Sequence, residues 1–147
     1  MELIRFLLLA IFMAFTGCRP RQIPGDRCFS QVTGLSLPPG VTSVGAKTFT
    51  VAIVWLDTHY LKFQATNDIT PFLVANFHAT TWQMITNHMT PPSDWLKEIP
   101  FWKQSTFEQH AHYSAVFTNQ SGVRFETAIS YDTNRMQFYF VGSQVRD

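Results

Sequence analysis

Glu108, His110 and His112 are spaced so that their side chains could bind a metal ion together. On a β-strand, residues at i, i+2 and i+4 project from one face, where two imidazoles and a carboxylate can ligate Zn²⁺ or Cu²⁺. A fourth ligand is not evident, because the other histidines are scattered over other segments: His59, His78 and His88. A polar sheet face explains the same pattern, so a metal site and a purely structural role both stay open.

Large aromatic side chains crowd the segment around Pro91 and Pro92. They are Trp82, Trp95, Phe101, Trp102 and Phe107. Aromatic planes bind sugars or peptides, and long loops often carry function, so the three tryptophans are candidate ligand-binding residues. Such a loop also needs aromatic side chains to fasten it to the body of the domain, and we favour this packing role.

The sequence favours a protein that is not an enzyme. It contains no Gly-x-Ser-x-Gly motif and no phosphate-binding loop, and its acidic residues are too dispersed to predict a carboxylate pair. Cys28 lies beside a polar, Pro-containing stretch, which is a poor place for a preorganised nucleophile. We therefore expect no catalytic residue and no cofactor, and we expect Cys28 to be buried.

Composition and charge exclude further classes. Charged residues make up 14% and aromatic residues 15% of the chain, which is typical of a packed globule and not of a disordered tail. A net charge of +1 argues against a nucleic-acid partner, since binding nucleic acid needs a basic face.

The N-terminal segment is typical of an export signal. Arg5 supplies a positive charge, and residues 6–15 form an uninterrupted apolar run. At about ten residues, this run matches the hydrophobic core of a signal peptide and is too short for a membrane span of about twenty. Small residues, Thr16 and Gly17, then precede Cys18, as a signal peptidase requires at its cut site.

Phe15-Thr16-Gly17-Cys18 resembles the lipobox of bacterial lipoproteins, with Phe15 where that family usually has Leu. The resemblance implies that residues 1–17 are removed and that Cys18 becomes a lipidated N-terminus carrying a diacylglycerol. Two or more acyl chains anchor a protein stably to a membrane. The alternative is an ordinary secretory signal, which would permit a disulfide between Cys18 and Cys28.

The lipobox resemblance also implies a location. The domain would be anchored on the extracytoplasmic side of the cell membrane. In enteric lipoproteins an Asp after the lipidated Cys retains the protein at the inner membrane, and this chain has Arg19 instead. In a cell with two membranes, the resemblance therefore implies the periplasmic side of the outer membrane.

Three segments follow from this interpretation: a signal peptide (1–17), a lipidated N-terminus with a tether (18–34), and one globular domain (35–147). The tether is predicted from its polar residues together with prolines and Gly25. Its basic side chains can each gain up to about 1 kcal/mol near anionic lipid headgroups, or simply remain solvated. They are Arg19, Arg21 and Arg27. Removing 17 of the 147 residues leaves 130, which suits a single domain.

Apolar periodicity predicts a β-hairpin followed by a helix. Phe49, Val51, Ile53 and Trp55 share one face of the first strand, and Leu61, Phe63 and Ala65 share one face of the second. Asp57-Thr58-His59 is the predicted turn. A helix is predicted to start within residues 67–71 and to end near residues 76–80, with either Asp68 or Thr70 as its cap. Pro71 suits a first turn, and Ile69, Phe72, Leu73 and Phe77 fall on one side. Residues 81–89 fit neither period, and residues 93–97 predict one helical turn.

The last third predicts three strands at 113–118, 125–131 and 136–141, joined by turns at 119–122 and 132–135. We therefore expect an α+β fold with two layers. Its antiparallel sheet of about five strands follows the order β-β-α-loop-β-β-β, with one main helix on one face and the other face wet. Cystatin-like folds share this outline, which licenses no function.

Leu37-Pro38-Pro39, and Pro91-Pro92 with Trp95, loosely resemble small exported proteins from which no activity carries over. The sequence thus predicts a membrane-anchored envelope lipoprotein whose domain binds an envelope protein or peptidoglycan. The alternative is a lipoprotein that binds a small ligand or a metal ion. It would use either the face of Glu108, His110 and His112 or the tryptophan-rich loop.

Overall fold

The structure is a computed structural model that describes residues 23–51 and 54–146. The predicted signal peptide, the predicted lipidation site Cys18 and residues 18–22 of the predicted tether lie outside the described residues. Ile53, which the sequence assigns to a strand, also lies outside them. Among the helices that the structure describes, none is long and apolar enough to cross a bilayer.

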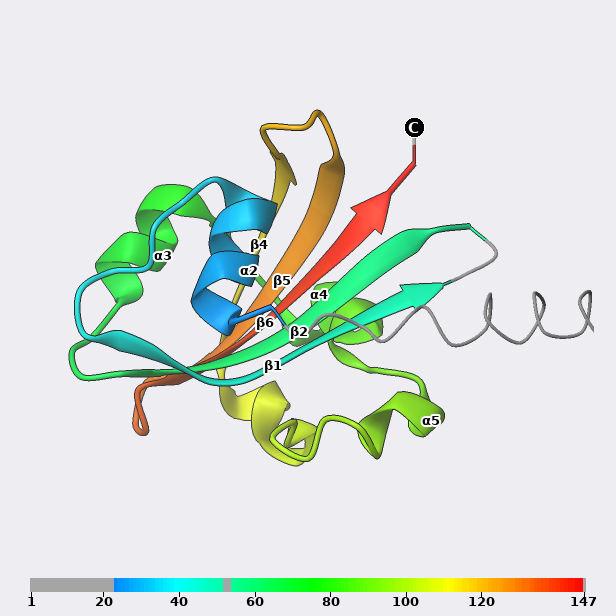
Figure 1. Cartoon of the computed structure of the whole chain (residues 1–147). Coiled ribbons are helices and arrows are strands. Elements are labelled where there is room, and N and C mark those ends of the chain that lie inside the picture. Colours follow the sequence, from blue (N-terminus) through cyan, green and yellow to red (C-terminus); the bar gives the residue numbers. More distant parts are fainter. Residues whose placement is uncertain (1–22, 52–53, 147) are drawn as a thin grey trace, which may run out of the picture.

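A six-stranded antiparallel sheet with the strand order β1-β2-β6-β5-β4-β3 forms the centre of the fold (Figure 1). The strands are β1 (Val41–Val51), β2 (Leu56–Ala65), β3 (His78–Thr80), β4 (Ala111–Thr118), β5 (Arg124–Asp132) and β6 (Gln137–Val145). The predicted hairpin corresponds to β1 and β2, and the predicted meander to β4, β5 and β6. The α+β class and the antiparallel sheet are confirmed, with one strand more than expected.

One face of the sheet packs against two helices, α2 (Gly25–Thr33) and α3 (Thr70–Asn76), which lie together on one side in Figure 1. The Phe29 ring of α2 lies 5.8 Å from the Phe63 ring and 5.1 Å from the Phe140 ring, both edge to face. Leu73 of α3 is fully buried in the same cluster. Burying a side chain of this size stabilises the fold by roughly 1.5–3 kcal/mol, so this face holds the main core.

The opposite face is covered by α4 (Trp82–Met89), α5 (Ser93–Leu96) and the 3-10 helix η1 (Gln104–Gln109). Tyr60 and Tyr139 point from the sheet to this side, and the ring of Trp102 meets them edge to face at 5.0 and 5.4 Å. The prediction of two layers with a wet face is therefore wrong, because helices lie on both sides of the sheet (Figure 1). Tyr60 and Tyr139 are both buried in this second core.

Residues 25–33 form helix α2, so the predicted tether is wrong over this stretch. Cys28, Phe29 and Val32 follow helical spacing and are buried in the main core. Gly34 ends the helix with a φ of 72°, a left-handed conformation that glycine adopts without strain. The globular domain therefore includes α2 and does not begin at residue 35.

Local predictions differ in two further places. The predicted turn at Asp57-Thr58-His59 lies inside β2, and the hairpin turns earlier, because Val51 pairs with Leu56. The ambiguous segment 81–89 contains α4, which buries Ile85 and Met89. Helices α3 and α5 lie where the sequence predicts them.

Candidate functional site

Glu108, His110 and His112 do not share one strand face. Glu108 belongs to η1 and is exposed, His110 follows η1, and only His112 lies on β4. The strand spacing on which the metal prediction rests therefore does not apply to Glu108. Within residues 23–51 and 54–146, no group of three or more His, Cys, Asp or Glu side chains is placed to hold a metal ion.

His110 instead joins a serine and an aspartate that the sequence analysis does not single out. Its Nδ1 lies 2.8 Å from Ser130 Oγ, and its Nε2 lies 3.7 Å from Asp132 Oδ2. The three residue types are those of a nucleophilic triad. Ser130, however, is 0% exposed, so no substrate reaches its hydroxyl. Burial lowers the pKa of His110, and the Asp132 carboxylate opposes that fall. The arrangement acts as a buried polar link between β5 and the start of β4.

His112 is buried, and both of its ring nitrogens and the hydroxyl of a neighbouring residue lack a hydrogen-bond partner among the described residues. Among the residues that the structure describes, neither its Nδ1 nor its Nε2 has a hydrogen-bond partner, and neither has the buried Oγ1 of Thr80, the residue opposite it on β3. The Trp82 ring lies above the imidazole, with ring centroids 5.5 Å apart. Burial lowers the pKa of His112, and the neighbouring His110 lowers it further. The backbone carbonyl of Glu108 opposes this lowering, although it is not placed to accept a hydrogen bond of ordinary geometry from the imidazole.

The predicted ligand-binding tryptophans pack the segment around Pro91 and Pro92 onto the sheet. Trp102 is buried and donates its indole N–H to the Met89 carbonyl at 3.1 Å. Trp95 stacks on Phe49 with ring centroids 4.2 Å apart. Trp82 is half-buried at the start of α4. The tryptophans thus make packing contacts of the kind that the sequence favours. Trp102 is too buried to contact a ligand.

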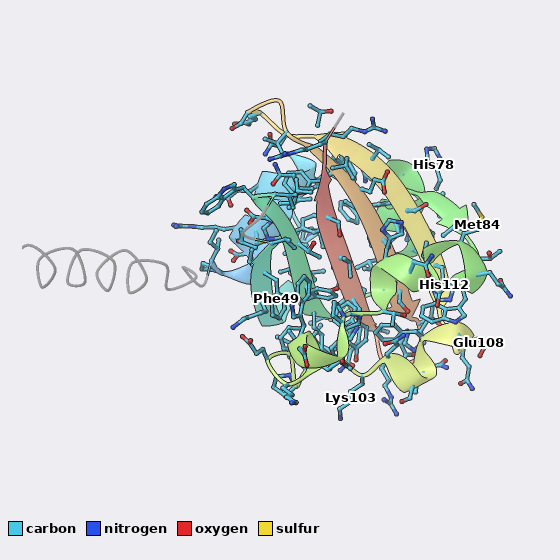
Figure 2. All side chains as sticks on the ribbon, turned by 90° about the vertical axis from the view of Figure 1, so that its right-hand side faces the viewer. Phe49, His78, Met84, Lys103, Glu108 and His112 are labelled. Atoms are coloured by element: carbon cyan, nitrogen blue, oxygen red, sulfur yellow. The ribbon has the colours of Figure 1, made fainter. Side chains whose placement is uncertain are left out.

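A groove of about 420 Å³ lies between α4 and the strands β3, β4 and β5; we call it the α4 groove. Figure 2 shows His78 and Met84, which border it, on the side of the molecule opposite Phe49. Its lining includes apolar Ile85 and Val116 and polar Thr80, His88 and Glu126. His88 Nε2 lies 3.8 Å from Glu126 Oε2 across the groove. This lining suits a ligand with both apolar and hydrogen-bonding groups.

The outer edge of β4 is free next to this groove. β3 pairs only with residues 112–114 of β4. The Asn119 N–H donates to the Val123 carbonyl at 2.8 Å, so the odd-numbered residues of β4 turn their backbone groups toward β5. Those of Val116 and Thr118 then point outward. Within the part of the chain that the structure describes, no strand or backbone hydrogen bond covers this side of either residue.

A second polar cluster lies in the main core. Thr48 Oγ1 is 2.8 Å from His59 Nδ1 and interacts with the Cys28 thiol. Burial lowers the pKa of His59 to about 4 and raises the pKa of Cys28 to about 12. Cys28 is free and buried, as the sequence predicts, and its thiol stays protonated. The cluster depends on α2, which sequence reasoning missed.

No family model, no curated protein and no solved structure matches this chain.

Proposed function

We propose that this protein is a bacterial envelope lipoprotein, anchored through Cys18, whose domain binds an extended segment of a partner protein. The lipobox-like Phe15-Thr16-Gly17-Cys18 supports the anchor and an extracytoplasmic location. Arg19 supports the outer membrane as the destination in a cell with two membranes. Binding, and not catalysis, is the role of the domain.

The observation that carries the binding role is the free edge of β4 beside the α4 groove. An extended peptide gains main-chain hydrogen bonds when it adds a strand to an open sheet edge. Val116 and Thr118 present N–H and C=O groups there, and Val116 is 54% exposed. A side chain of the added strand reaches the groove, where Met84 offers an apolar contact and Glu126 a charged one. Edge and groove together provide both affinity and side-chain selection.

Two buried nucleophile candidates support binding over catalysis. Ser130 is within hydrogen-bond distance of His110 but is inaccessible. Cys28 is buried, and its raised pKa keeps the thiol protonated at neutral pH. Acyl transfer needs an exposed and activated nucleophile, which neither residue supplies.

A photo-crosslinking experiment in cells tests the partner surface. Val116→p-benzoylphenylalanine should give a discrete protein adduct on irradiation. The matched control is Val74→p-benzoylphenylalanine, because Val74 is also exposed but lies on α3, on the opposite face. Adducts of equal yield at both positions, or at neither, would remove the β4 edge as the binding surface.

The anchor has a separate test. Cys18→Ser should move the protein from the membrane to the soluble fraction, because lipid cannot be attached to the serine. A variant with Cys28→Ser should stay in the membrane fraction and serves as the control. If the Cys18→Ser protein still sediments with membranes, the anchor proposal is wrong.

A small polar ligand in the α4 groove is the second candidate. The unpartnered Thr80 Oγ1 in the wall of the groove favours it, because such an atom gains a hydrogen bond when a ligand enters. Peptidoglycan fragments are a suitable probe. The fluorescence of Trp82, whose ring centroid lies 5.5 Å from that of His112, can report on fragments that bind in the groove. A flat titration would exclude these fragments.

A further inference from the structure

The described chain begins beside the β1 edge of the sheet. Ile23, Pro24 and Gly25 border the same shallow depression as residues 43–46 of β1. Gly25 allows this close approach, because a Cβ there would lie 2.2 Å from Ser43 Oγ. The sheet order places β1 at one edge and β3 with β4 at the other. With about 4.8 Å between strands, the two edges lie roughly 24 Å apart.

The chain between the anchor and this edge is short. Five residue steps separate Cys18 from Ile23. An extended chain spans at most about 3.6 Å per residue, so Ile23 lies within about 18 Å of the Cys18 backbone. A lipid on Cys18 therefore holds the β1 edge close to the bilayer surface.

The β1 edge and the tip of the β1–β2 hairpin expose apolar side chains. Val44 is 54% exposed, Val51 is 39% exposed, and Trp55, in the turn after β1, is 67% exposed. Trp55 has a φ of 50°, an uncommon left-handed conformation for this residue. Tryptophan is enriched where hydrocarbon meets headgroups, because its ring is apolar and its N–H is polar.

Basic side chains accompany this surface. Arg27 is exposed on α2, and Arg146 donates from Nη2 to the Val54 carbonyl at the hairpin tip, 2.5 Å away. Arg19 and Arg21 follow Cys18 in the sequence. The acids near this edge are Asp26 on α2, Asp57, which accepts a hydrogen bond from Thr50 of β1, and Glu98, which is paired with Lys47 of β1. The four arginines therefore outnumber the two acids that no lysine neutralises. Their charge complements anionic lipid headgroups, which attract Arg and Lys within a Debye length of the surface.

We infer that the β1 edge, with the exposed side chains of Val44, Val51 and Trp55, is the membrane-facing surface of the domain and rests on anionic lipid headgroups. This inference rests on the proposed lipid anchor. It directs the opposite edge, with the α4 groove and the outer side of β4, away from the bilayer. The partner surface then stays open to a protein or to cell wall above the membrane.

The test places an environment-sensitive label on each edge of the lipidated full chain in vesicles that contain phosphatidylglycerol. Val44→Cys and Val116→Cys, each labelled with NBD, are a matched pair, because both valines are 54% exposed. Cys28 is buried and protonated, so it does not compete for the label. NBD at Val44 should shift to shorter wavelength and be quenched by doxyl lipids, and NBD at Val116 should do neither.

Flotation of the vesicles separates the inference from the anchor on which it rests. If the protein floats but both labels stay solvent-like, or both are quenched alike, the anchor holds and the orientation is wrong. If the protein does not float, both are wrong. Trp55→Ser is a second, label-free variant: it should reduce the quenching of tryptophan fluorescence by brominated lipids. Unchanged quenching would contradict contact at the hairpin tip.

Discussion

Two histidines, one on each face of the sheet, are buried to the same extent but differ in their partners. His59 and His112 are each 7% exposed, and burial is the largest cause of a lowered pKa in both. His59 Nδ1 lies 2.8 Å from the Thr48 hydroxyl, whereas neither ring nitrogen of His112 has a hydrogen-bond partner within residues 23–51 and 54–146. Histidine therefore forms a stabilising hydrogen bond on one face of the sheet and leaves buried polar atoms unsatisfied, which is destabilising, on the other.

The difference separates a face whose buried histidine is hydrogen-bonded from a face whose buried histidine is not. A buried polar atom without a partner costs about 1–3 kcal/mol, and such atoms need an explanation when they occur. Those of His112 and Thr80 lie at or beside the α4 groove. Local rules are broken most often at functional sites, so the unsatisfied face fits the binding role proposed for the groove. In the cluster around His59, by contrast, the imidazole Nδ1 is hydrogen-bonded.

The largest expected effect is a loss of stability in acid that originates at His59. In the unfolded chain this residue takes up a proton near pH 6.5, whereas burial lowers its pKa in the folded protein to about 4. Between pH 4 and pH 6.5 the unfolded state binds more protons than the folded state. The free energy of unfolding therefore has its full value above pH 6.5 and falls as the pH drops toward 4. The loss is about 3 kcal/mol, since a tenfold change in proton affinity is worth about 1.4 kcal/mol.

Urea unfolding at pH 7 and pH 4 measures this loss, and the His59→Leu variant isolates it. The variant should lose much less stability between the two pH values than the wild-type protein. Equal losses in both proteins would assign the acid sensitivity to other groups, such as His110 or His112.

A leucine at position 59 should itself destabilise the protein at pH 7 by about 2 kcal/mol. Leucine has a similar volume but leaves the half-buried Thr48 hydroxyl without its imidazole partner. The midpoint of urea unfolding, followed by tryptophan fluorescence, reads the change. A neutral result would mean that the Thr48–His59 contact contributes nothing net.

The strands that bury one face were predictable from the sequence, whereas the two histidine clusters were not. Leu61, Phe63 and Ala65 alternate in a way that only a strand explains, and all three are buried in the main core. Helix α2 was missed, because Pro24 and Gly25 were read as a tether. Gly34 after the helical spacing of Cys28, Phe29 and Val32 is a stop signal that sequence reasoning could have used.

The position of Thr80 opposite His112 could not be predicted. β3 has three residues, too few for a period to show, and it exists because it pairs with β4. Register between distant strands decides which polar side chains meet, and a single sequence does not contain it. The metal prediction fails for a local reason: η1 includes Glu108, so the strand that carries His112 begins only at Ala111.

His112→Leu should have the opposite sign to His59→Leu. It removes two unpartnered nitrogens and keeps an apolar group of similar volume beneath Trp82, so the protein should gain about 1 kcal/mol. The same urea titration measures it. A loss as large as that of His59→Leu would erase the contrast between the two faces and would imply that His112 has a partner under working conditions.

The smallest effect is expected at the two threonines that accompany the histidines. Thr80→Val removes an unpartnered hydroxyl and should be neutral or stabilise the protein by about 0.5 kcal/mol, whereas Thr48→Val breaks the contact with His59 and should cost about 1 kcal/mol. Because the substitution is identical, differences in volume and β propensity largely cancel between the two sites. If Thr80→Val also weakened binding of a peptidoglycan fragment, its hydroxyl would be a ligand contact in the α4 groove. If both variants were equally destabilised, hydrogen-bond satisfaction would not be what distinguishes the two faces of the sheet.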